Sequence, residues 1–398
     1  MGSVGQTIVS DRGEADYFHG RQEEIDFVKG ILEKSQEKKK AHSVLIQGAP
    51  GVGKTALLRK LEEVGKKLGW HIAKMEFEAF WDVNVLHHVL FKQKKFEKRA
   101  KEIRGDIGLL KGSMRYEKTK PIFSKMIQSI QKPMILVLDE AQMISYGHTK
   151  DSPEMKQASY VLNQFHNLQN KKGLIFLVAG LGDTRKIFKD FKISRFNSRC
   201  VINLNLLDRE SEKRIIQDYL VKGGGVDSRN PDLLHWIDRI SQETYQWAHH
   251  ISCYGQVALE MVKNKKGILS NQILTEVLEE SRELKIEYYD GRFEELQAFE
   301  RASIFYALFE NEVKEKVIIG NQVESDFEIN PIVKNAESMF QDVVSRGIIQ
   351  IRRDGFYEIP IPSLRTWMLG EYQEYLKMMN QKPSPKIQKL FQALKQSS

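Results

Sequence analysis

The sequence predicts an α/β fold in which a parallel sheet carries the ligand site, and three observations point to it. Apolar runs at residues 44–46, 134–138 and 174–179 read as short strands. The second and third runs contain no polar residue, as expected of central parallel strands that are covered on both faces. Each run ends in glycines or carboxylates, at the edge where a parallel sheet binds its ligand.

The loop after the first run carries the most specific motif in the chain. Residues 48–55 read GAPGVGKT between a strand and a helix, which is the complete pattern and context of a phosphate-binding loop. Its glycines let successive backbone N–H groups turn toward one point, where the start of the helix adds positive potential. A flexible glycine turn is the alternative, and the flanking strand and helix argue against it. The residues expected to bind nucleotide phosphates are Gly48, Ala49, Pro50, Gly51, Val52, Gly53, Lys54, Thr55 and Ala56.

Four side chains are expected to carry out phosphoryl chemistry. Lys54 would reach the β- and γ-phosphates, and the Thr55 hydroxyl would ligate Mg²⁺ beside them. Asp139 and Glu140 end the second apolar run. Asp139 would hold the Mg²⁺ shell through water, and Glu140 would polarise the attacking water. A strand followed by two carboxylates can arise by chance, but behind a phosphate-binding loop it is a strong signal. No residue near the base distinguishes ATP from GTP.

Further candidates lie after the third apolar run. Asp183 or Thr184 would come near the γ-phosphate, and the sequence does not choose between them. Arg195 and Arg199 precede a strand at residues 200–204, from which either could neutralise transition-state charge at a nucleotide in an adjacent subunit. Surface salt bridges are the alternative explanation for these two arginines.

The segment ahead of the first helix is a candidate base-binding site. Residues 17–21 read YFHGR, in which the aromatic pair Tyr17-Phe18 and the glycine could lie against an adenine ring. Phe18 and Arg21 are the candidate nucleotide-binding residues of this segment. The equally weighted alternative is a hydrophobic staple at the start of that helix.

Composition bounds the class of protein. The chain has 398 residues, which suits two or three domains, with 41% hydrophobic and 29% charged residues. No apolar run approaches the ~20 residues of a membrane-spanning helix, and the first residues lack the apolar core of a secretory signal. We therefore expect a cytoplasmic location and no membrane. The two cysteines have no CxxC spacing, so neither a disulfide framework nor a zinc site is indicated. A net charge of +8 favours an acidic partner such as nucleic acid.

The second half of the chain reads as a helical bundle followed by a different module. Asp208 is expected to cap the first bundle helix, with Glu210 and Glu212 in its first turn. Helical patterns and then a hairpin turning at Asp354-Gly355 predict a winged helix. Arg352 and Arg353 would lie at the wing tip, where they could touch DNA phosphates or keep an edge strand soluble.

The expected organisation has five parts. They are an N-terminal arm (1–16), a phosphate-loop ATPase core (17–205), a helical lid (206–285), a winged-helix-like domain (286–375) and a basic C-terminal tail (376–398).

With these motifs in hand, the chain resembles an AAA+ ATPase over about residues 17–375. It is most similar to the branch of origin-recognition and helicase-loader ATPases, together with bacterial mobile-element ATPases and STAND-type switch ATPases. The resemblance implies a P-loop sheet of AAA+ type, and it makes Arg195 or Arg199 the candidate arginine finger. One departure is that the family's lid arginine, in a GxxRxAL pattern, has no counterpart in Gly255–Leu259.

The resemblance implies a MgATP-driven switch that forms homo-oligomers and engages double-stranded DNA through the winged helix. The alternative is a signalling or anti-phage defence ATPase whose winged helix packs internally and whose output is a protein effector. A scaffold that binds ATP without turnover is a third possibility.

Overall fold

The computed structural model describes residues 17–38, 43–75, 77–80, 82, 85–86, 90, 133–145, 152–172, 174–182, 184–190, 200–293, 296, 304, 343–344, 346–351, 357–378, 380 and 382–397. Its centre is one five-stranded sheet in the order β2-β3-β4-β1-β5. The strands are β1 (Val44–Gln47), β2 (His71–Met75), β3 (Met134–Leu138), β4 (Leu174–Gly180) and β5 (Val201–Asn203). Every neighbouring pair is parallel, which confirms the predicted fold class.

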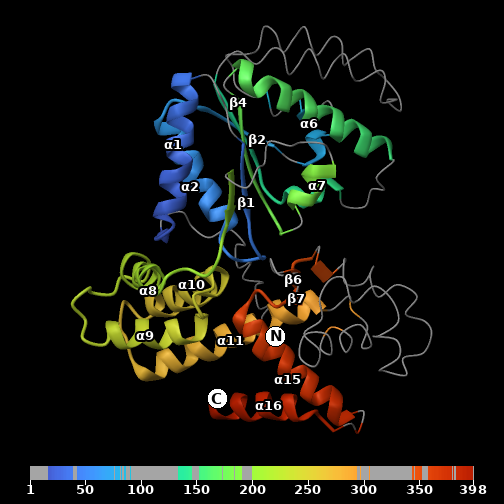
Figure 1. The fold of residues 1–398 in the computed structure, drawn as a ribbon. Helices are drawn as coiled ribbons and strands as arrows, with labels where there is room; N and C mark the ends of the chain where they lie inside the picture. The colour runs from blue at the N-terminus through green and yellow to red at the C-terminus, as the bar shows by residue number, and fades with distance from the viewer. Residues whose placement is uncertain are drawn as a thin grey trace, which may run out of the picture.

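Helices cover both faces of the sheet, which explains why its central strands contain almost no polar residue (Figure 1). Alternate side chains of a strand point to opposite faces. Ile135 and Val137 thus pack in one apolar cluster with α1 (Gln22–Lys38) and α2 (Lys54–Lys67). Leu136 of the same strand packs in a second cluster. The elements of that second cluster are α6 (Pro153–Lys172), α7 (Thr184–Asp190) and the 3₁₀ turns η2 (Phe77–Phe80) and η4 (Ala141–Ser145).

A helical lid follows the sheet. Its elements are α8 (Arg209–Asp218), a π-helical turn η6 (Tyr219–Gly223), α9 (Leu233–Thr244), α10 (Ala248–Asn264) and α11 (Asn271–Phe293). They share an apolar core of their own, in which Trp236, Ile240 and Tyr254 are fully buried. Asp208 caps α8 as predicted, because its carboxylate accepts a hydrogen bond from the Ser211 N–H at 2.8 Å.

In its described residues, the last part of the chain contains a short hairpin and two helices. Strands β6 (Gln350–Ile351) and β7 (Tyr357–Glu358) pair antiparallel, as the predicted hairpin requires, with a register centred on residue 354 beside the expected turn. Arg352 and Arg353 lie outside the described residues, as do most of the helical patterns at 293–346. Two helices close the chain, α15 (Pro362–Met378) and α16 (Pro385–Ser397). The segment expected as a basic tail therefore includes a helix.

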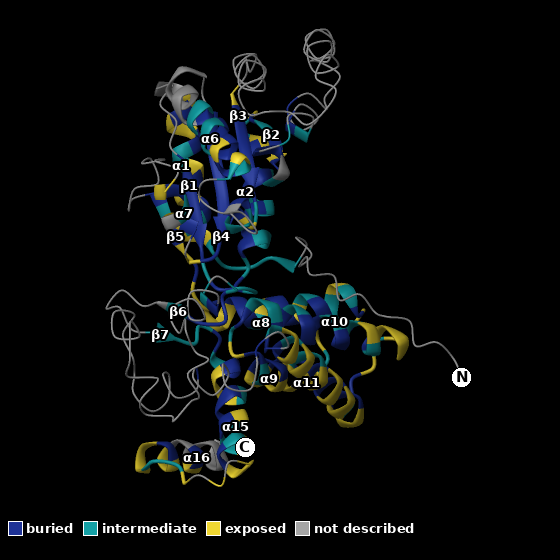
Figure 2. Cartoon of the chain, turned by 90° about the vertical axis from the view of Figure 1, so that its right-hand side faces the viewer, coloured by how far each residue is buried: buried dark blue, intermediate teal, exposed yellow. Residues whose placement is uncertain are grey.

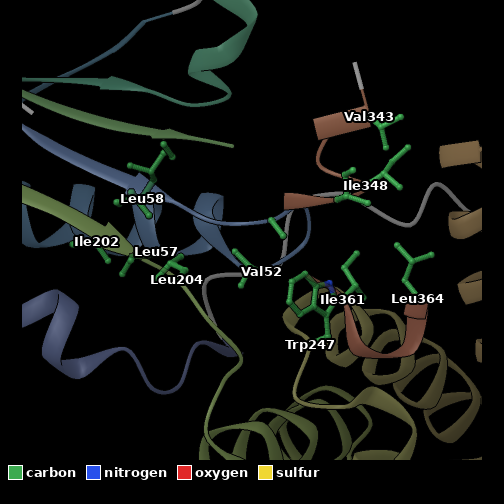
Figure 3. Close-up of a cluster of buried hydrophobic side chains, with 14 of the residues drawn as sticks. Val52, Leu57, Leu58, Ile202, Leu204, Trp247, Val343, Ile348, Ile361 and Leu364 are labelled. Carbon is green, nitrogen blue, oxygen red and sulfur yellow. The ribbon is translucent and has the colours of Figure 1, made fainter. Parts of the chain in front are cut away.

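One apolar cluster joins the sheet, the lid and the last part of the chain (Figure 3). It runs from Leu57 and Leu58 of α2, past Trp247 between α9 and α10, to Ile348 and Leu364. Figure 2 shows the same continuity as buried residues along the sheet, at the junction and on α15. Within the described ranges, no helix is both long and apolar enough to cross a membrane.

Candidate nucleotide site

The phosphate-binding loop joins the end of β1 to the start of α2, and its three glycines are needed for two different reasons. Gly51 and Gly53 have φ values of 78° and 98°, in the left-handed region that glycine adopts without strain. Gly48 is needed for space, because a Cβ atom there would lie 2.7 Å from Val52 Cγ1 and 3.1 Å from the Leu204 carbonyl oxygen. Gly53 is also the N-cap of α2 and offers no capping side chain, so the first N–H groups of α2 face the loop as an anion site requires.

Lys54 is buried at the start of α2 and is anchored to the phosphate-binding loop. Its side chain is 4% exposed, and Nζ donates to the carbonyl oxygens of Gly48 and Ala49 at 3.1 Å each. An ammonium has three donors, so one remains for a phosphate oxygen. Burial lowers the pKa of Lys54, while the nearby carboxylates of Glu140 and Asp139 act to raise it.

Thr55 and Asp139 meet although they lie 84 residues apart. The Thr55 hydroxyl donates to Asp139 Oδ2 at 2.6 Å, beside the N-terminal end of α2. A hydroxyl and a carboxylate are hard oxygen ligands, which Mg²⁺ prefers, and it usually takes only one or two protein ligands with substrate phosphate and water. The predicted pair thus fits a magnesium ion, which would be held here by Thr55 and Asp139.

Glu140 has a constrained backbone and an anchored side chain. Its φ of 47° is unusual for a residue with a Cβ, and its N–H donates to Asp139 Oδ1 at 2.9 Å. Gln142 Nε2 donates to the Glu140 carboxylate, while Gln142 Oε1 accepts from the Leu181 N–H at 3.2 Å. Gln142 therefore bridges Glu140 and the segment after β4. Sequence reasoning assigned no role to Gln142, although its position two residues after Glu140 was the available signal.

Of the other predicted site residues, three are described by the structure and three are not. Thr184 is fully buried against Gly180, and Phe18 packs on the shared apolar cluster. Arg21 donates to the Asn205 carbonyl oxygen at 2.5 Å, and burial lowers the pKa of its guanidinium. The remaining predicted residues, Asp183, Arg195 and Arg199, lie outside the described residues.

The start of α10 lies directly on the phosphate-binding loop. The His249 N–H donates to the Gly51 carbonyl oxygen at 2.8 Å. A Cβ atom at Gly51 would lie 2.8 Å from His249 Cβ and 3.0 Å from Trp247 Nε1, and one at Gly53 would lie 3.3 Å from Ala248 Cβ. Trp247 and His249 therefore both pack on the phosphate-binding loop.

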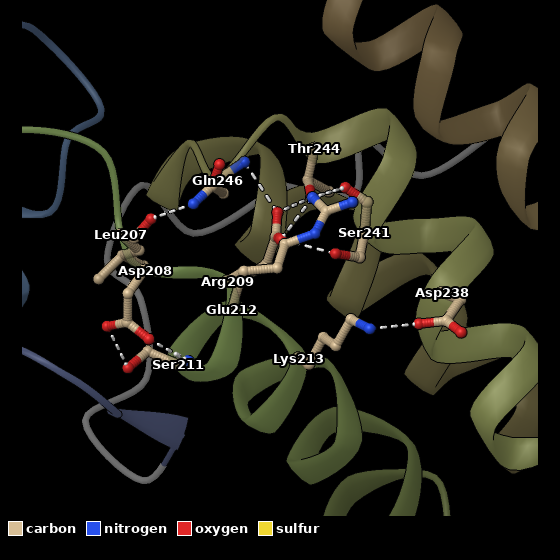
Figure 4. Close-up of polar contacts among 10 residues, drawn as sticks. All are labelled: Leu207, Asp208, Arg209, Ser211, Glu212, Lys213, Asp238, Ser241, Thr244 and Gln246. Carbon is tan, nitrogen blue, oxygen red and sulfur yellow. Dashed lines mark hydrogen bonds and ion pairs between the residues drawn. The ribbon is translucent and has the colours of Figure 1, made fainter.

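A buried carboxylate shapes the turn that brings Trp247 to the loop (Figure 4). Glu212 is fully buried, and it accepts hydrogen bonds from Thr244 Oγ1 at 2.5 Å, the Gln246 N–H at 2.8 Å and Ser241 Oγ at 2.6 Å. Tyr245 and Gln246 have φ values of 52° and 60°, so this turn costs backbone strain that the hydrogen bonds offset. From the sequence, the position of Glu212 in the first turn of α8 predicted only an interaction with the helix dipole.

The last part of the chain also reaches the loop. Gly347, with a φ of 71°, lies so close to Pro50 that a Cβ atom would be 2.6 Å from both Cγ and Cδ of the proline ring. The same atom would be 3.3 Å from Leu181 Cδ2. The phosphate-binding loop is thus contacted by the lid on one side and by the segment at Gly347 on another.

Comparison with known proteins agrees with this geometry. Residues 17–159 match the family of AAA ATPase domains. The fold is similar to that of the ORC2 protein of Aeropyrum pernix, solved as ADPNP-ADP complexes, with a TM-score of 0.54 at 13% identity over 90% of this chain and 96% of that one. Two further structures with lower TM-scores are ORC1 of Aeropyrum pernix in complex with DNA and domain III of the replication initiation protein DnaA of Thermotoga maritima.

For ORC1 the TM-score is 0.47 at 13% identity, covering 91% of this chain and 95% of that one. For the DnaA domain it is 0.43 at 15% identity, covering 67% and 95%. No curated protein matches the chain by sequence.

The fold and the site together define a P-loop NTPase. Within that class, residues 17–159 match the family of AAA ATPase domains, and this match supports ATP hydrolysis at the site.

Proposed function

We propose that the protein is a switch which assembles into homo-oligomers with MgATP, engages double-stranded DNA in that state and is reset by hydrolysis. The observation that carries the switch is the double contact on the phosphate-binding loop, by His249 from the lid and by Gly347 from the last part of the chain. A nucleotide that shifts the loop on binding would therefore act on both parts of the chain.

Hydrolysis follows from the placement of four side chains. Lys54 would hold the β- and γ-phosphates, and Glu140 would orient a water molecule and take its proton. The water oxygen then bonds to the γ-phosphorus while the bond from that phosphorus to the β–γ bridging oxygen breaks, which releases phosphate and ADP. A magnesium ion on Thr55 and Asp139 would neutralise charge on the phosphates. Gln142 keeps the Glu140 carboxylate aimed, because its other end is fixed to the Leu181 N–H.

Charge supports DNA as the partner. The net charge of the chain is +8, and residues 377–395 contain five lysines and no acidic residue. Lys382 and Lys389 of this stretch are exposed. Clustered lysines on one terminal segment suit a phosphate backbone, since neutralising phosphates releases counterions. The predicted winged helix, with Arg352 and Arg353 at its tip, would add a second contact.

A measurement of phosphate release tests the proposal. Wild type and Glu140→Gln are compared with MgATP, with and without double-stranded DNA, and each mixture is sized. We expect DNA to stimulate the wild type, ATP to drive assembly, and Glu140→Gln to bind ATP and assemble without turnover. ATP binding that leaves the particle size unchanged, together with a turnover insensitive to DNA at low salt, would refute the DNA-directed switch.

The second candidate is a signalling ATPase that acts on a protein effector. The contact of Gly347 with Pro50 favours it, because this segment is engaged within the chain itself. Replacing Arg352 and Arg353 by alanine separates the two functions. A DNA-binding protein loses affinity and part of its salt dependence, whereas a module that packs internally changes in neither.

A further inference from the structure

Arg292 lies next to the phosphate-binding loop, although it belongs to the far end of α11. Its guanidinium carbon lies 4.5 Å from the centre of the Tyr288 ring, and NH1 donates to the Arg346 carbonyl oxygen at 3.3 Å. Tyr288 and Arg346 are both close to the phosphate-binding loop. The Tyr288 hydroxyl would be 3.4 Å from a Cβ atom at Gly51, and Arg346 precedes Gly347, which packs on Pro50.

The charge of Arg292 is uncompensated within the part of the chain that the structure describes. No carboxylate there forms an ion pair with it, and its Nε is buried without a hydrogen-bond partner. A buried guanidinium N–H without an acceptor is costly, and an anion is an acceptor that suits it. Its field is felt at the loop, because Arg292 is among the charges that lower the pKa of Lys54. Arg292 thus lies close enough to Lys54 for their charges to repel each other.

We propose that Arg292 binds the terminal phosphate of MgATP and so supplies, from α11, the cation that Gly255–Leu259 of α10 lack. The inference rests on the proposed binding of MgATP at this loop. A guanidinium presents a planar fork of donors that matches phosphate oxygens, and the unpaired Nε would be one of those donors. Stacking on Tyr288 fixes the plane of the fork.

The hydrogen bond from Arg292 to Arg346 would couple the terminal phosphate to the last part of the chain. Arg292 NH1 donates to the Arg346 carbonyl oxygen over 3.3 Å, so a phosphate that draws the guanidinium toward itself would weaken that bond. Gly347, the next residue, rests on Pro50. ATP and ADP would therefore leave this segment in different positions, because only ATP brings a terminal phosphate to Arg292.

The test compares nucleotide affinities of wild type, Arg292→Ala, Arg292→Lys and the control Arg239→Ala, in the full chain. Arg239 lies exposed on α9, where it donates to Gln242. Dissociation constants are measured by fluorescence for MgADP and for a non-hydrolysable MgATP analogue. We expect Arg292→Ala to weaken the ATP analogue about tenfold to hundredfold with little change for ADP, as loss of one charge-assisted contact predicts. Arg292→Lys should recover part of the loss, and Arg239→Ala should match wild type.

The possible outcomes separate this inference from the proposed function. An Arg292→Ala protein that discriminates ATP from ADP as wild type does overturns the inference, while the ATPase proposal stands. Equal weakening for both nucleotides also overturns it, because it means that Arg292 only supports the packing around the loop. If wild type binds neither nucleotide, the proposed function itself has failed.

Discussion

Glu212 is predicted to determine whether the lid can rest on the phosphate-binding loop. Replacing it by alanine leaves the Gln246 N–H and the hydroxyls of Ser241 and Thr244 without their acceptor. A buried donor without a partner costs about 1–3 kcal/mol. Thr244 can still donate to the Ser241 carbonyl oxygen, and Arg209 can turn to water because its side chain is 46% exposed. Counting the Gln246 N–H and one hydroxyl, we expect Glu212→Ala to lower the free energy of unfolding of the lid by ~2–6 kcal/mol.

Glu212→Gln should cost less, about 1–2 kcal/mol, because its amide oxygen can still accept from Thr244 and Gln246 while the Ser241 hydroxyl reverses and accepts. The matched control is Glu210→Ala, two residues before Glu212, whose carboxylate is 75% exposed and pairs with Arg214. An exposed pair of this kind contributes ~0–1 kcal/mol.

Denaturant unfolding followed by tryptophan fluorescence measures these differences, since Trp236 is fully buried in the lid core. Nucleotide affinity should fall alongside stability, because the turn at Tyr245 and Gln246 positions Trp247 on the loop. A Glu212→Ala protein as stable as Glu210→Ala would refute the reasoning, for it would mean that the buried hydrogen bonds are replaced at no cost.

Three further predictions concern the site and its surroundings. Gln142→Ala should reduce kcat about 10–100-fold with little change in the dissociation constant of MgATP, since it frees the Glu140 carboxylate and leaves the loop intact. Single-turnover phosphate release measures the rate, and a separate binding titration measures the affinity. Thr55→Val should abolish the magnesium dependence of ATP binding at an unchanged fold, which nucleotide titration at several Mg²⁺ concentrations and circular dichroism together reveal. Burial beside Tyr289 and Ser363, with His249 and Lys285 nearby, holds the pKa of His250 well below its ordinary value. Below a pH of ~6.5 the unfolded chain therefore binds a proton that the folded chain does not, and stability should fall as pH drops. The denaturant midpoint of His250→Gln should decline less steeply than that of wild type between about pH 6.5 and 5, and an identical slope would contradict this assignment.

The features that could be predicted from the sequence are those encoded by neighbouring residues. The loop at 48–55 and the carboxylates at Asp139 and Glu140 follow a strand directly, so a short motif and its context suffice to place them. The hairpin centred on residue 354 is likewise signalled by its own turn.

The remaining features depend on contacts between distant residues, which no local pattern encodes. Gln142 meets Leu181 across 39 residues, and Glu212 meets Gln246 across 34. Arg292 reads as the end of a charged helix until packing brings that end to the loop. Asp183, Arg195 and Arg199 stay predictions, since they lie outside the described residues.

The contact between Pro50 and Gly347 bears on how the protein is made. The two residues are separated by roughly 300 positions, so the loop leaves the ribosome long before the segment that rests on it. At about 5–20 residues per second, synthesis would reach Gly347 some 15–60 s later. During that interval the nascent chain has its phosphate-binding loop but lacks the segment at Gly347 that packs on it. We therefore expect the nucleotide site to be completed only after Gly347 has left the ribosome, so a nascent chain that ends before it should bind nucleotide more weakly.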